Sequence, residues 1–559
     1  STPSTPDPTS VSLYVNGEQV TSFSTATYPS QNVTTSINAA ALHTIGERAD
    51  LGGSNYDGYL ADVHFIDGTA LTPTSFAEED ATTGQWKPKA YDTADGTYGT
   101  NGFHLDFEED SATSGSNAGI GKDVSGKGNY FDTTNLAASD VVLDTPTDNF
   151  CTFNPLNAYS AIVGMLAEGN LRVTTATGAS GYQMMSTMGV SSGKWYYEYR
   201  DDSPPSRNTG VGWVDSKQTP TGSGAGAINQ NGAIFYHDYI YVNGGGASAG
   251  DTLDNGDICG VALDADVGKI WFSINGTWWD SQDPAAGSNA KYTASTNSDI
   301  WVPSFMDGNY GQGTVNYGQD GTFAGAVTAQ GNADGNGRGD FYYTPPTGFL
   351  ALSTGNLPTP TIAKPSEHFS ATTYTGNSTT NAITTGQQPD LLWIKSRGAA
   401  RAHNLFDSVR GLSAGALYSN TTDTEDSVAR IASLDTNGFT TSSTNYTYTN
   451  NNAEAYVAWS WKKSATAGMD IITWTGNDDG TGASPTPQSV THSLNVAPEL
   501  IIAKSRTQNT FNNFNWVVWH KDLTSGNYLL LNGNGGETGW YDALVSSIGS
   551  SSVTFGSDA

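Results

Sequence analysis

The chain has 559 residues, more than the roughly 250–300 residues that one hydrophobic core supports, so several domains are expected. Lys and Arg total 24 against 55 Asp and Glu, and a net charge of −31 repels phosphate, which argues against a nucleic-acid partner. No run approaches about 18 apolar residues, which argues against membrane insertion. Abundant glycine (65 residues) and 11% aromatic residues are typical of short strands joined by turns, and predict an all-β chain of tandem β-sandwich (jelly-roll-like) modules.

The cysteines and histidines give no sign of a metal centre. Cys151 and Cys259 are too few for a disulfide framework and lack the spacing of a structural zinc site, so two buried free thiols are expected. The eight histidines are scattered singly, without helical i, i+4 spacing and without a neighbouring cysteine. Neither a zinc site nor a general base is therefore predicted.

The first elements are short strands. Val11–Val15 and Gly58–Ile66 alternate partly between apolar and polar residues, as half-buried strands do, and Asn16-Gly17 is typical of a hairpin turn. A short helical turn is expected next, with Thr72 as its N-cap and Pro73 at its first position.

A second module is expected over residues 150–352. Its apolar stretches Lys194–Arg200, Ile258–Leu263 and Lys269–Ile274 are separated by Gly, Asn and Asp turns. This spacing predicts another β-sandwich. The proline-punctuated segment 353–366 that follows is typical of a linker between domains.

A degenerate repeat follows the linker. Tyr374-Thr-Gly-Asn377 and Pro389–Arg397 recur as Trp474-Thr-Gly-Asn477 and Pro498–Arg506, at offsets of 100 and 109 residues. The difference is a longer loop around residues 478–485 in the second copy, and loops are where repeats tolerate insertion.

The repeat defines two further modules, β-rich repeat 1 over residues 367–463 and β-rich repeat 2 over residues 464–559. The first copy ends in the apolar strand Ala455–Trp461, which has no counterpart in the second copy. The second copy is therefore expected to be truncated.

The N-terminal motifs resemble two kinds of known sequence. Leu13-Tyr-Val-Asn-Gly17, Ile45-Gly46 and Asp57–Asp67 followed by Leu71-Thr72 resemble the second half of a concanavalin A-like (laminin-G-like) lectin domain, which would be partial here and occupy residues 1–90. Tyr98–Phe107 and Asp123–Asn129 look like a connector common in phage tail-fibre and virion structural proteins, which would occupy residues 91–149.

The second module resembles a SPRY domain. The resemblance is carried by Gly193-Lys-Trp-Tyr-Tyr-Glu198, Asp257–Asp264 and Gly268–Gly276. Both resembling families are β-sandwiches used chiefly for binding, so the resemblance implies recognition of a glycan or a protein surface.

Aromatic side chains concentrate around the loops of this module, and aromatic faces stack on the C–H surfaces of sugars. Strand aromatics are also frequent core residues, but two adjacent strand residues point to opposite faces, so one member of Trp278-Trp279 is expected to be accessible. The candidate ligand-binding residues are Trp213, Tyr236, Tyr239, Tyr241, Trp278 and Trp279.

One loop partly resembles a calcium loop. Asn332, Asp334 and Asn336 followed by Gly337 provide alternating oxygens, with Asp340 as a further acidic ligand. The bidentate Glu that normally occupies the twelfth position is absent, and a solvated turn is the alternative. Calcium is the one cofactor that the sequence admits.

No catalytic residue is predicted, and the chain is expected not to be an enzyme. Gly246-Ala-Ser-Ala-Gly250 satisfies the G-x-S-x-G pattern, but the nucleophile elbow requires a strand before the serine and a helix after it, and glycine-rich turns surround this one. Acidic clusters at Glu108–Asp110 and Asp254–Asp257 are typical of turns.

Together the resemblances imply a bacteriophage virion appendage, similar to a tail fibre, that lies on the extracellular virion surface. Its expected partners are a host cell-surface glycan or protein and other virion proteins, and the analogy favours a homo-oligomer, specifically a trimer. A purely structural capsid-decoration or filament protein is the alternative. A polysaccharide depolymerase would need a long β-helix repeat or a clear carboxylate pair, and neither is visible.

Overall fold

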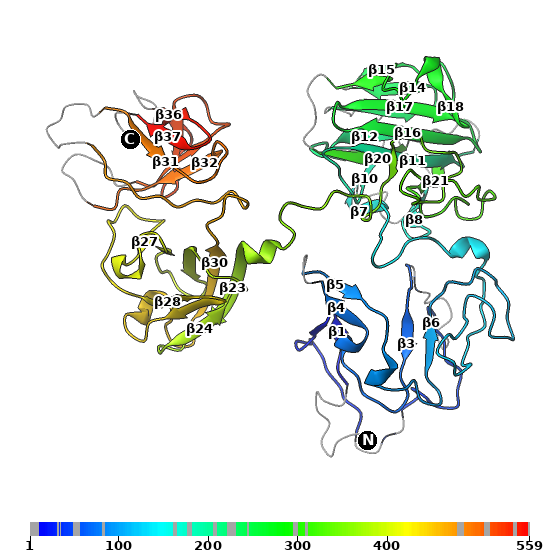
Figure 1. The fold of residues 1–559 in the computed structure, drawn as a ribbon, viewed down its shortest axis with the longest axis horizontal. Coiled ribbons are helices and arrows are strands. Elements are labelled where there is room, and N and C mark those ends of the chain that lie inside the picture. The colour runs from blue at the N-terminus through cyan, green and yellow to red at the C-terminus, as the bar shows by residue number, and fades with distance from the viewer. Residues whose placement is uncertain are drawn as a thin grey trace. The chain divides into compact units, whose positions relative to one another are not determined.

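The structure is a computed structural model of the chain, and its elements are strands and single 3-10 turns (Figure 1). It describes residues 11–30, 33, 35–47, 56, 58–80, 84–159, 165–175, 182–204, 209–220, 231–242, 245–294, 300–307, 311–477, 486–507, 515–539 and 545–556. The all-β fold class is thereby confirmed. No helix among these residues is long and apolar enough to cross a membrane.

The chain forms two compact units. One comprises Ser1–Asp80 and Gln85–Pro358, and the other comprises Ala81–Gly84 and Thr359–Ala559. The predicted loop insertion around residues 478–485 lies outside the described residues.

The first unit begins with short paired strands, and the predicted Asn16-Gly17 turn is confirmed. β1 (Tyr14–Val15) pairs antiparallel with β2 (Glu18–Gln19), and φ is 49° at Asn16 and 84° at Gly17, the left-handed conformations that a two-residue hairpin turn requires. The other elements before residue 150 are β3 (Val63–Phe65), η1 (Pro73–Ser75), β4 (Ala77–Glu79), β5 (Trp86–Pro88), η2 (Thr93–Asp95), β6 (Phe103–Leu105) and η3 (Ala138–Asp140).

Two pairings hold these elements together. β4 pairs with β5, and β3 pairs with β6, so a sheet joins segments on both sides of the boundary predicted at residue 90. Thr72 is the N-cap of the turn at Pro73, as predicted, but its hydroxyl contacts Thr74 Oγ1 and caps no backbone N–H.

Residues 150–358 contain two sheets (teal to green in Figure 1), in which all pairings are antiparallel except the parallel pairing of β22 with β11. The seven-stranded sheet has the order β15 (Gly245–Ser248), β14 (Tyr239–Val242), β13 (Gly232–Tyr236), β12 (Thr209–Asp215), β20 (Trp301–Asp307), β10 (Tyr182–Ser186), β7 (Phe153–Ala158). The nine-stranded sheet has the order β18 (Thr277–Trp278), β17 (Lys269–Ile274), β16 (Ile258–Asp264), β11 (Lys194–Asp201), β21 (Gln312–Asn316), β9 (Arg172–Thr174), β8 (Leu166–Ala167). Two further strands complete it: β19 (Tyr292–Thr293) pairs with β17, and β22 (Leu350–Ala351) pairs with β11. The turn η6 (Trp279–Ser281) follows β18.

Strand β11 contributes to two cores because side chains alternate between the faces of a strand. Trp195, Tyr197 and Tyr199 belong to the main core, to which both sheets contribute. Tyr196 belongs to a second cluster on the other face, which contains Phe341 and other residues near the end of the module. Cys151 and Cys259 lie in the main core as buried free thiols, as predicted.

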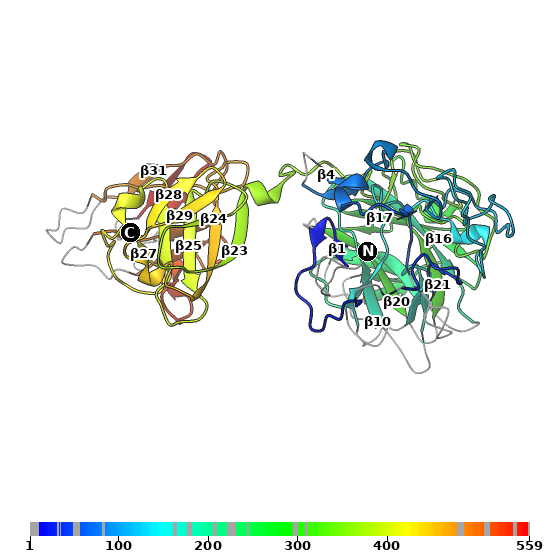
Figure 2. The ribbon, with the colours of Figure 1, turned by 90° about the horizontal axis from the view of Figure 1, so that it is seen from below.

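The first copy of the repeat has its own core between two sheets (Figure 2). Its five-stranded sheet has the order β23 (Phe369–Thr375), β30 (Ala455–Trp461), β25 (Leu391–Ser396), β26 (Asn404–Asp407), β27 (Leu417–Tyr418). Its three-stranded sheet has the order β24 (Asn381–Thr384), β29 (Gly438–Thr441), β28 (Ile431–Asp435), and its turns are η7 (Pro365–Glu367), η8 (Leu412–Ala414) and η9 (Tyr446–Tyr448).

The described residues of the second copy also form two sheets. Its sheets have the orders β31 (Gln488–Thr491), β37 (Ser552–Phe555), β36 (Val545–Ile548), and β32 (Leu500–Ala503), β33 (Val517–His520), β34 (Asn527–Leu530), β35 (Thr538–Gly539). One hydrogen bond from a backbone N–H to an asparagine side chain occurs in both copies. His403 N–H donates to Asn420 Oδ1 at 2.8 Å in the first copy, and Trp516 N–H donates to Asn532 Oδ1 at 2.7 Å in the second. Trp516 therefore occupies the position that His403 has in the first copy.

A tryptophan joins the two copies. Trp516 is 5% exposed and packs with Leu405 and Leu417 of the first copy. Its indole N–H donates to the carbonyl oxygen of Tyr418 at 2.7 Å. The contact thus combines burial of a large apolar ring with a hydrogen bond across the copies.

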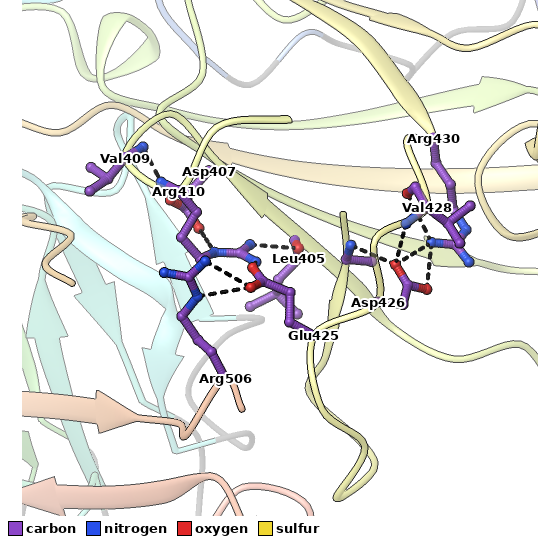
Figure 3. Close-up of polar contacts among 10 residues, drawn as sticks. Leu405, Asp407, Val409, Arg410, Glu425, Asp426, Val428, Arg430 and Arg506 are labelled. Atoms are coloured by element: carbon purple, nitrogen blue, oxygen red, sulfur yellow. Dashed lines mark hydrogen bonds and ion pairs between the residues drawn. The ribbon is translucent and has the colours of Figure 1, made fainter. Parts of the chain in front are cut away.

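An ion-pair group lies at the same junction. Glu425 accepts from Arg506 Nη2 at 2.8 Å with one carboxylate oxygen and from Arg410 Nη1 at 2.5 Å with the other (Figure 3). Arg410 also contacts Asp407, and only 4% of the Arg410 side chain is exposed. Because one carboxylate serves a guanidinium from each copy, the ion pairs fix the orientation in which the copies meet.

We expect Trp516→Ala to lower the free energy of unfolding of residues 359–559 by about 3–5 kcal/mol, because it leaves a cavity between the copies. Trp516→Phe keeps most of the apolar contact but leaves the Tyr418 carbonyl without its donor, which should cost about 1–2 kcal/mol. Calorimetric unfolding of the full chain measures both changes. A profile that is unchanged in Trp516→Ala would show that the copies unfold independently.

Candidate functional site

Three tyrosines meet on one face of the seven-stranded sheet, and we call Tyr236, Tyr239 and Tyr241 the tyrosine patch. Tyr236 and Tyr239 are cross-strand partners on β13 and β14, and Tyr241 is two residues further along β14 on the same face. The ring centroids of Tyr236 and Tyr241 are 5.8 Å apart, and those of Tyr239 and Tyr241 are 6.0 Å apart. The hairpin thus gathers three of the six predicted ligand-binding residues.

The patch has a buried base and an exposed rim. Tyr236 and Tyr241 are partly buried and pack against a small cluster that includes Ile234 and Met306, and burial raises the pKa of Tyr241. Tyr239 is 42% exposed. Gly246, on the neighbouring strand β15, has no side chain, and a Cβ there would lie 2.7 Å from the ring of Tyr241. The glycine therefore makes room for this ring.

The tryptophans among the predicted ligand-binding residues lie outside the tyrosine patch. Trp213 and Trp279 are buried, which corrects the prediction that they bind a ligand. Trp213 is 0% exposed and packs edge-on against Tyr197 in the main core. Trp279 is 6% exposed and meets Phe235 edge-on with ring centroids 4.3 Å apart. Both indoles pack in the main core, where large apolar rings fill the space between the two sheets.

Trp278 points away from that core, as the alternation of strand residues predicts. It packs, partly buried, against the second cluster with Tyr196, at a ring distance of 6.4 Å. Trp278 is thus the only member of the adjacent tryptophan pair that keeps an appreciable exposed surface among the described residues.

The predicted calcium loop is a hydrogen-bonded turn in this structure. Asp334 is 8% exposed, and its carboxylate accepts four hydrogen bonds, from Asn336 N–H, Arg338 N–H, Ala351 N–H and Asn356 Nδ2. Asn332 Oδ1 accepts from Thr344, and Asp340 Oδ1 accepts from Gly331 N–H at 3.0 Å. Both carboxylate oxygens of Asp334 thus accept hydrogen bonds from protein donors. Calcium binding by Asn332, Asp334, Asn336 and Asp340 stays a prediction.

Glu198 is a buried carboxylate that sequence reasoning did not single out. It is 0% exposed and accepts from the backbone N–H groups of Tyr342 and Tyr343 at 2.8 and 2.7 Å, and from the Tyr196 hydroxyl at 3.1 Å. Burial raises the pKa of Glu198 to about 7, against the opposing effect of these donors. The carboxyl fastens the end of the module to β11, so its role is structural.

A second group that the sequence did not reveal lies on β3 and β6. His64 and His104 are cross-strand partners, and their rings stack with centroids 4.0 Å apart. His104 Nε2 lies 3.0 Å from Asp62 Oδ1, and one ligand atom from each of Asp62, His64 and His104 lies within 4.8 Å of the others. The prediction of isolated histidines is therefore wrong here, because antiparallel pairing unites residues that lie far apart in the sequence.

The G-x-S-x-G segment does not have the geometry of a nucleophile elbow. Gly245–Ser248 forms β15 at the margin of the seven-stranded sheet, its residues are exposed, and the residues after it form bends instead of a helix. The serine thus lies on an exposed strand, where a glycine-rich turn was expected, and no helix follows it.

Solved structures similar to part of this chain include SPRY domains. The SPRY domain of human HERC1 is 17% identical, and the match covers 29% of this chain and 96% of that one with a TM-score of 0.23. The PSpry domain of TRIM65 is 17% identical over 30% of this chain and 89% of that one, with a TM-score of 0.22. Stonustoxin is 20% identical over 30% of this chain and 27% of that one, with a TM-score of 0.23.

A family model matches most of the second unit. The family model that matches residues 364–559 is described as a domain of unknown function (DUF7483). This range contains both copies of the repeat. No curated protein matches the chain.

Trp213 and Tyr239 should differ sharply in their effect on stability. We expect Trp213→Ala to lower the free energy of unfolding of residues 150–358 by about 3–5 kcal/mol, because it empties the main core. Tyr239→Ala should change it by no more than about 0.5 kcal/mol, because the ring is largely at the surface. Chemical denaturation of the full chain tests the pair, and similar losses in both variants would contradict the assignment of core and surface.

The titration of Glu198 should make stability fall as the pH rises. Its carboxyl pKa is about 7 in the folded chain against an ordinary value of 4.5, so between these values the folded state holds a proton that the unfolded state has lost. The free energy of unfolding should therefore decrease from pH 4.5 to 7, by at most about 1.4 kcal/mol per pH unit from this group. Glu198→Gln should remove this slope, and an equal slope in parent and variant would refute the assignment.

Proposed function

We propose that this chain is a non-catalytic adhesin of a phage virion appendage, which binds a host cell-surface glycan through the tyrosine patch. The phage assignment rests on the resemblance of residues 91–149 to virion connectors. The binding assignment rests on one observation: three tyrosine rings gather on a hairpin, with Tyr239 42% exposed. No cofactor is required for this function.

The patch suits carbohydrate for two physical reasons. Aromatic faces stack on the C–H faces of a sugar ring, and the phenol hydroxyls can donate to and accept from its hydroxyl groups. Tyr236 and Tyr241 are held by packing against the cluster beneath them, so little side-chain entropy is lost when a ligand binds. A preformed aromatic surface of this kind also fits a protein loop, which is the alternative ligand.

A small aromatic patch gives only weak affinity by itself. An appendage overcomes this limit by presenting several copies to one cell, because linked sites convert later binding events into intramolecular ones. We therefore propose a homo-oligomer, with a trimer following from the tail-fibre analogy. The net charge of −31 keeps such an assembly soluble and is screened by the salt of an extracellular medium.

A structural role in the virion or in an extracellular filament is the second candidate. The observation that favours it is the interlocked pair of repeat copies, in which Trp516 and the Glu425 ion pairs fix one orientation. Such rigid joints suit a spacer. The two roles are compatible within one appendage, but only the adhesin requires a ligand for the tyrosine patch.

The adhesin proposal predicts that Tyr239→Ala weakens binding to a glycan array and to whole bacterial cells by about 10-fold or more. Tyr130→Ala is the matched control, since Tyr130 is 37% exposed and lies outside the patch. The full-length chain is used throughout, and light scattering on the same preparation gives the oligomeric state.

Saturable binding that is lost in Tyr239→Ala and kept in Tyr130→Ala would support the adhesin. Absence of binding by the parent at every density would leave the structural role. Equal losses in the two variants would place the binding surface elsewhere, and monomers alone in light scattering would contradict the trimer.

A further inference from the structure

Asp62, His64 and His104 form a group with closely spaced ligand atoms, which we call the His–His–Asp cluster. His64 and His104 are directly opposite each other on β3 and β6, where side chains share one face with Cβ atoms about 4.5–5.5 Å apart. Asp62 immediately precedes β3. Two imidazoles and a carboxylate thus converge from a rigid pair of strands.

The distances suit a metal ion. His104 Nε2 and Asp62 Oδ1 are 3.0 Å apart, and two ligands of a tetrahedral zinc ion, each at about 2.0–2.1 Å, lie about 3.3 Å from each other. One ligand atom of each of the three residues lies within 4.8 Å of the others, so no pair has to close by more than about 1.5 Å to reach this spacing.

Neighbouring residues contact the His64 ring and the His104 backbone. His64 Nδ1 lies 2.8 Å from the hydroxyl of Tyr98, which is 6% exposed. This contact leaves Nε2 of His64 for a metal, in the arrangement by which a second residue usually orients a ligating imidazole. The backbone N–H of His104 donates to Asp123 Oδ1 at 2.9 Å, and Asp123 is 2% exposed.

The backbone at Asp62 adds an independent observation. Its φ is 50°, in the left-handed region that residues other than glycine rarely adopt. Such a conformation costs free energy and is retained where the surroundings demand it, often at binding sites. Here it accompanies a carboxylate oriented toward His104.

We propose that Asp62, His64 and His104 bind one zinc ion, with a fourth position open to water or to a group from a partner. Two imidazoles and one carboxylate are a donor set that zinc favours when it keeps an open position. This site is separate from the tyrosine patch and does not depend on the adhesin function. The alternative to a metal site is a structural one, in which the stacked histidine pair packs with the rings of Phe76 and Tyr91.

Zinc binding to the chelator-treated full-length chain tests the proposal, by isothermal titration calorimetry and by the visible absorption of a tetrahedral Co(II) substitute. We expect one equivalent to bind the parent. Asp62→Asn, His64→Gln and His104→Gln should each weaken binding by more than about 100-fold, and Tyr98→Phe by about 10–100-fold. Zinc should raise the unfolding temperature of the parent and leave that of His104→Gln unchanged.

His237→Gln is the matched control. His237 also lies 3.0 Å from a carboxylate, that of Asp238, but the two offer only one imidazole. Loss of binding in the cluster variants with full binding in His237→Gln would support the site. The zinc proposal would be overturned if the parent bound no stoichiometric zinc, or if His104→Gln and His237→Gln weakened binding equally. The far-UV circular dichroism spectrum of His104→Gln should match that of the parent, which shows that the variant is folded and that the comparison is valid.

Discussion

Strand β11 must be buried on both of its faces, and the architecture of residues 150–358 follows from this requirement. Trp195, Tyr197 and Tyr199 on one face belong to the main core, which only a second sheet can complete. Tyr196 and Glu198 on the other face need a separate cover, which Tyr342 and Tyr343 provide through hydrogen bonds to the Glu198 carboxylate. A two-layer sandwich with an additional covering segment satisfies both demands, because it covers the rings on both faces and gives the Glu198 carboxylate hydrogen-bond donors.

The same demand decides which aromatic residues remain at the surface. The main core takes Trp213 and Trp279, since large rings fill the space between sheets most effectively. Tyr239 remains at the surface near the margin of the seven-stranded sheet, on a hairpin whose neighbour β15 carries glycines. The exposed aromatic surface of this hairpin thus consists of rings that the main core does not contain, and Tyr236 and Tyr241 pack against the cluster below them.

The second unit and the N-terminal part have smaller cores than residues 150–358 and depend more on specific contacts between side chains. The repeat copies gain burial by sharing Trp516 and by placing Glu425 between two guanidinium groups. β3 and β6 have only three residues each, and their pairing is supported by stacked rings and by the buried carboxylate of Asp123. A metal ion across this pair would add a cross-link where the apolar core is small.

The sequence by itself determined the all-β class, the Asn16-Gly17 hairpin, the buried free thiols and the repeat, because turn chemistry and the alternation of strand residues act over a few neighbouring positions. The tertiary structure alone decided that Trp213 is buried while Tyr239 is exposed, and that Asp334 serves backbone donors. It also decided that His64 meets His104. These outcomes depend on which distant segment covers each face of a strand, and no local pattern encodes that partner.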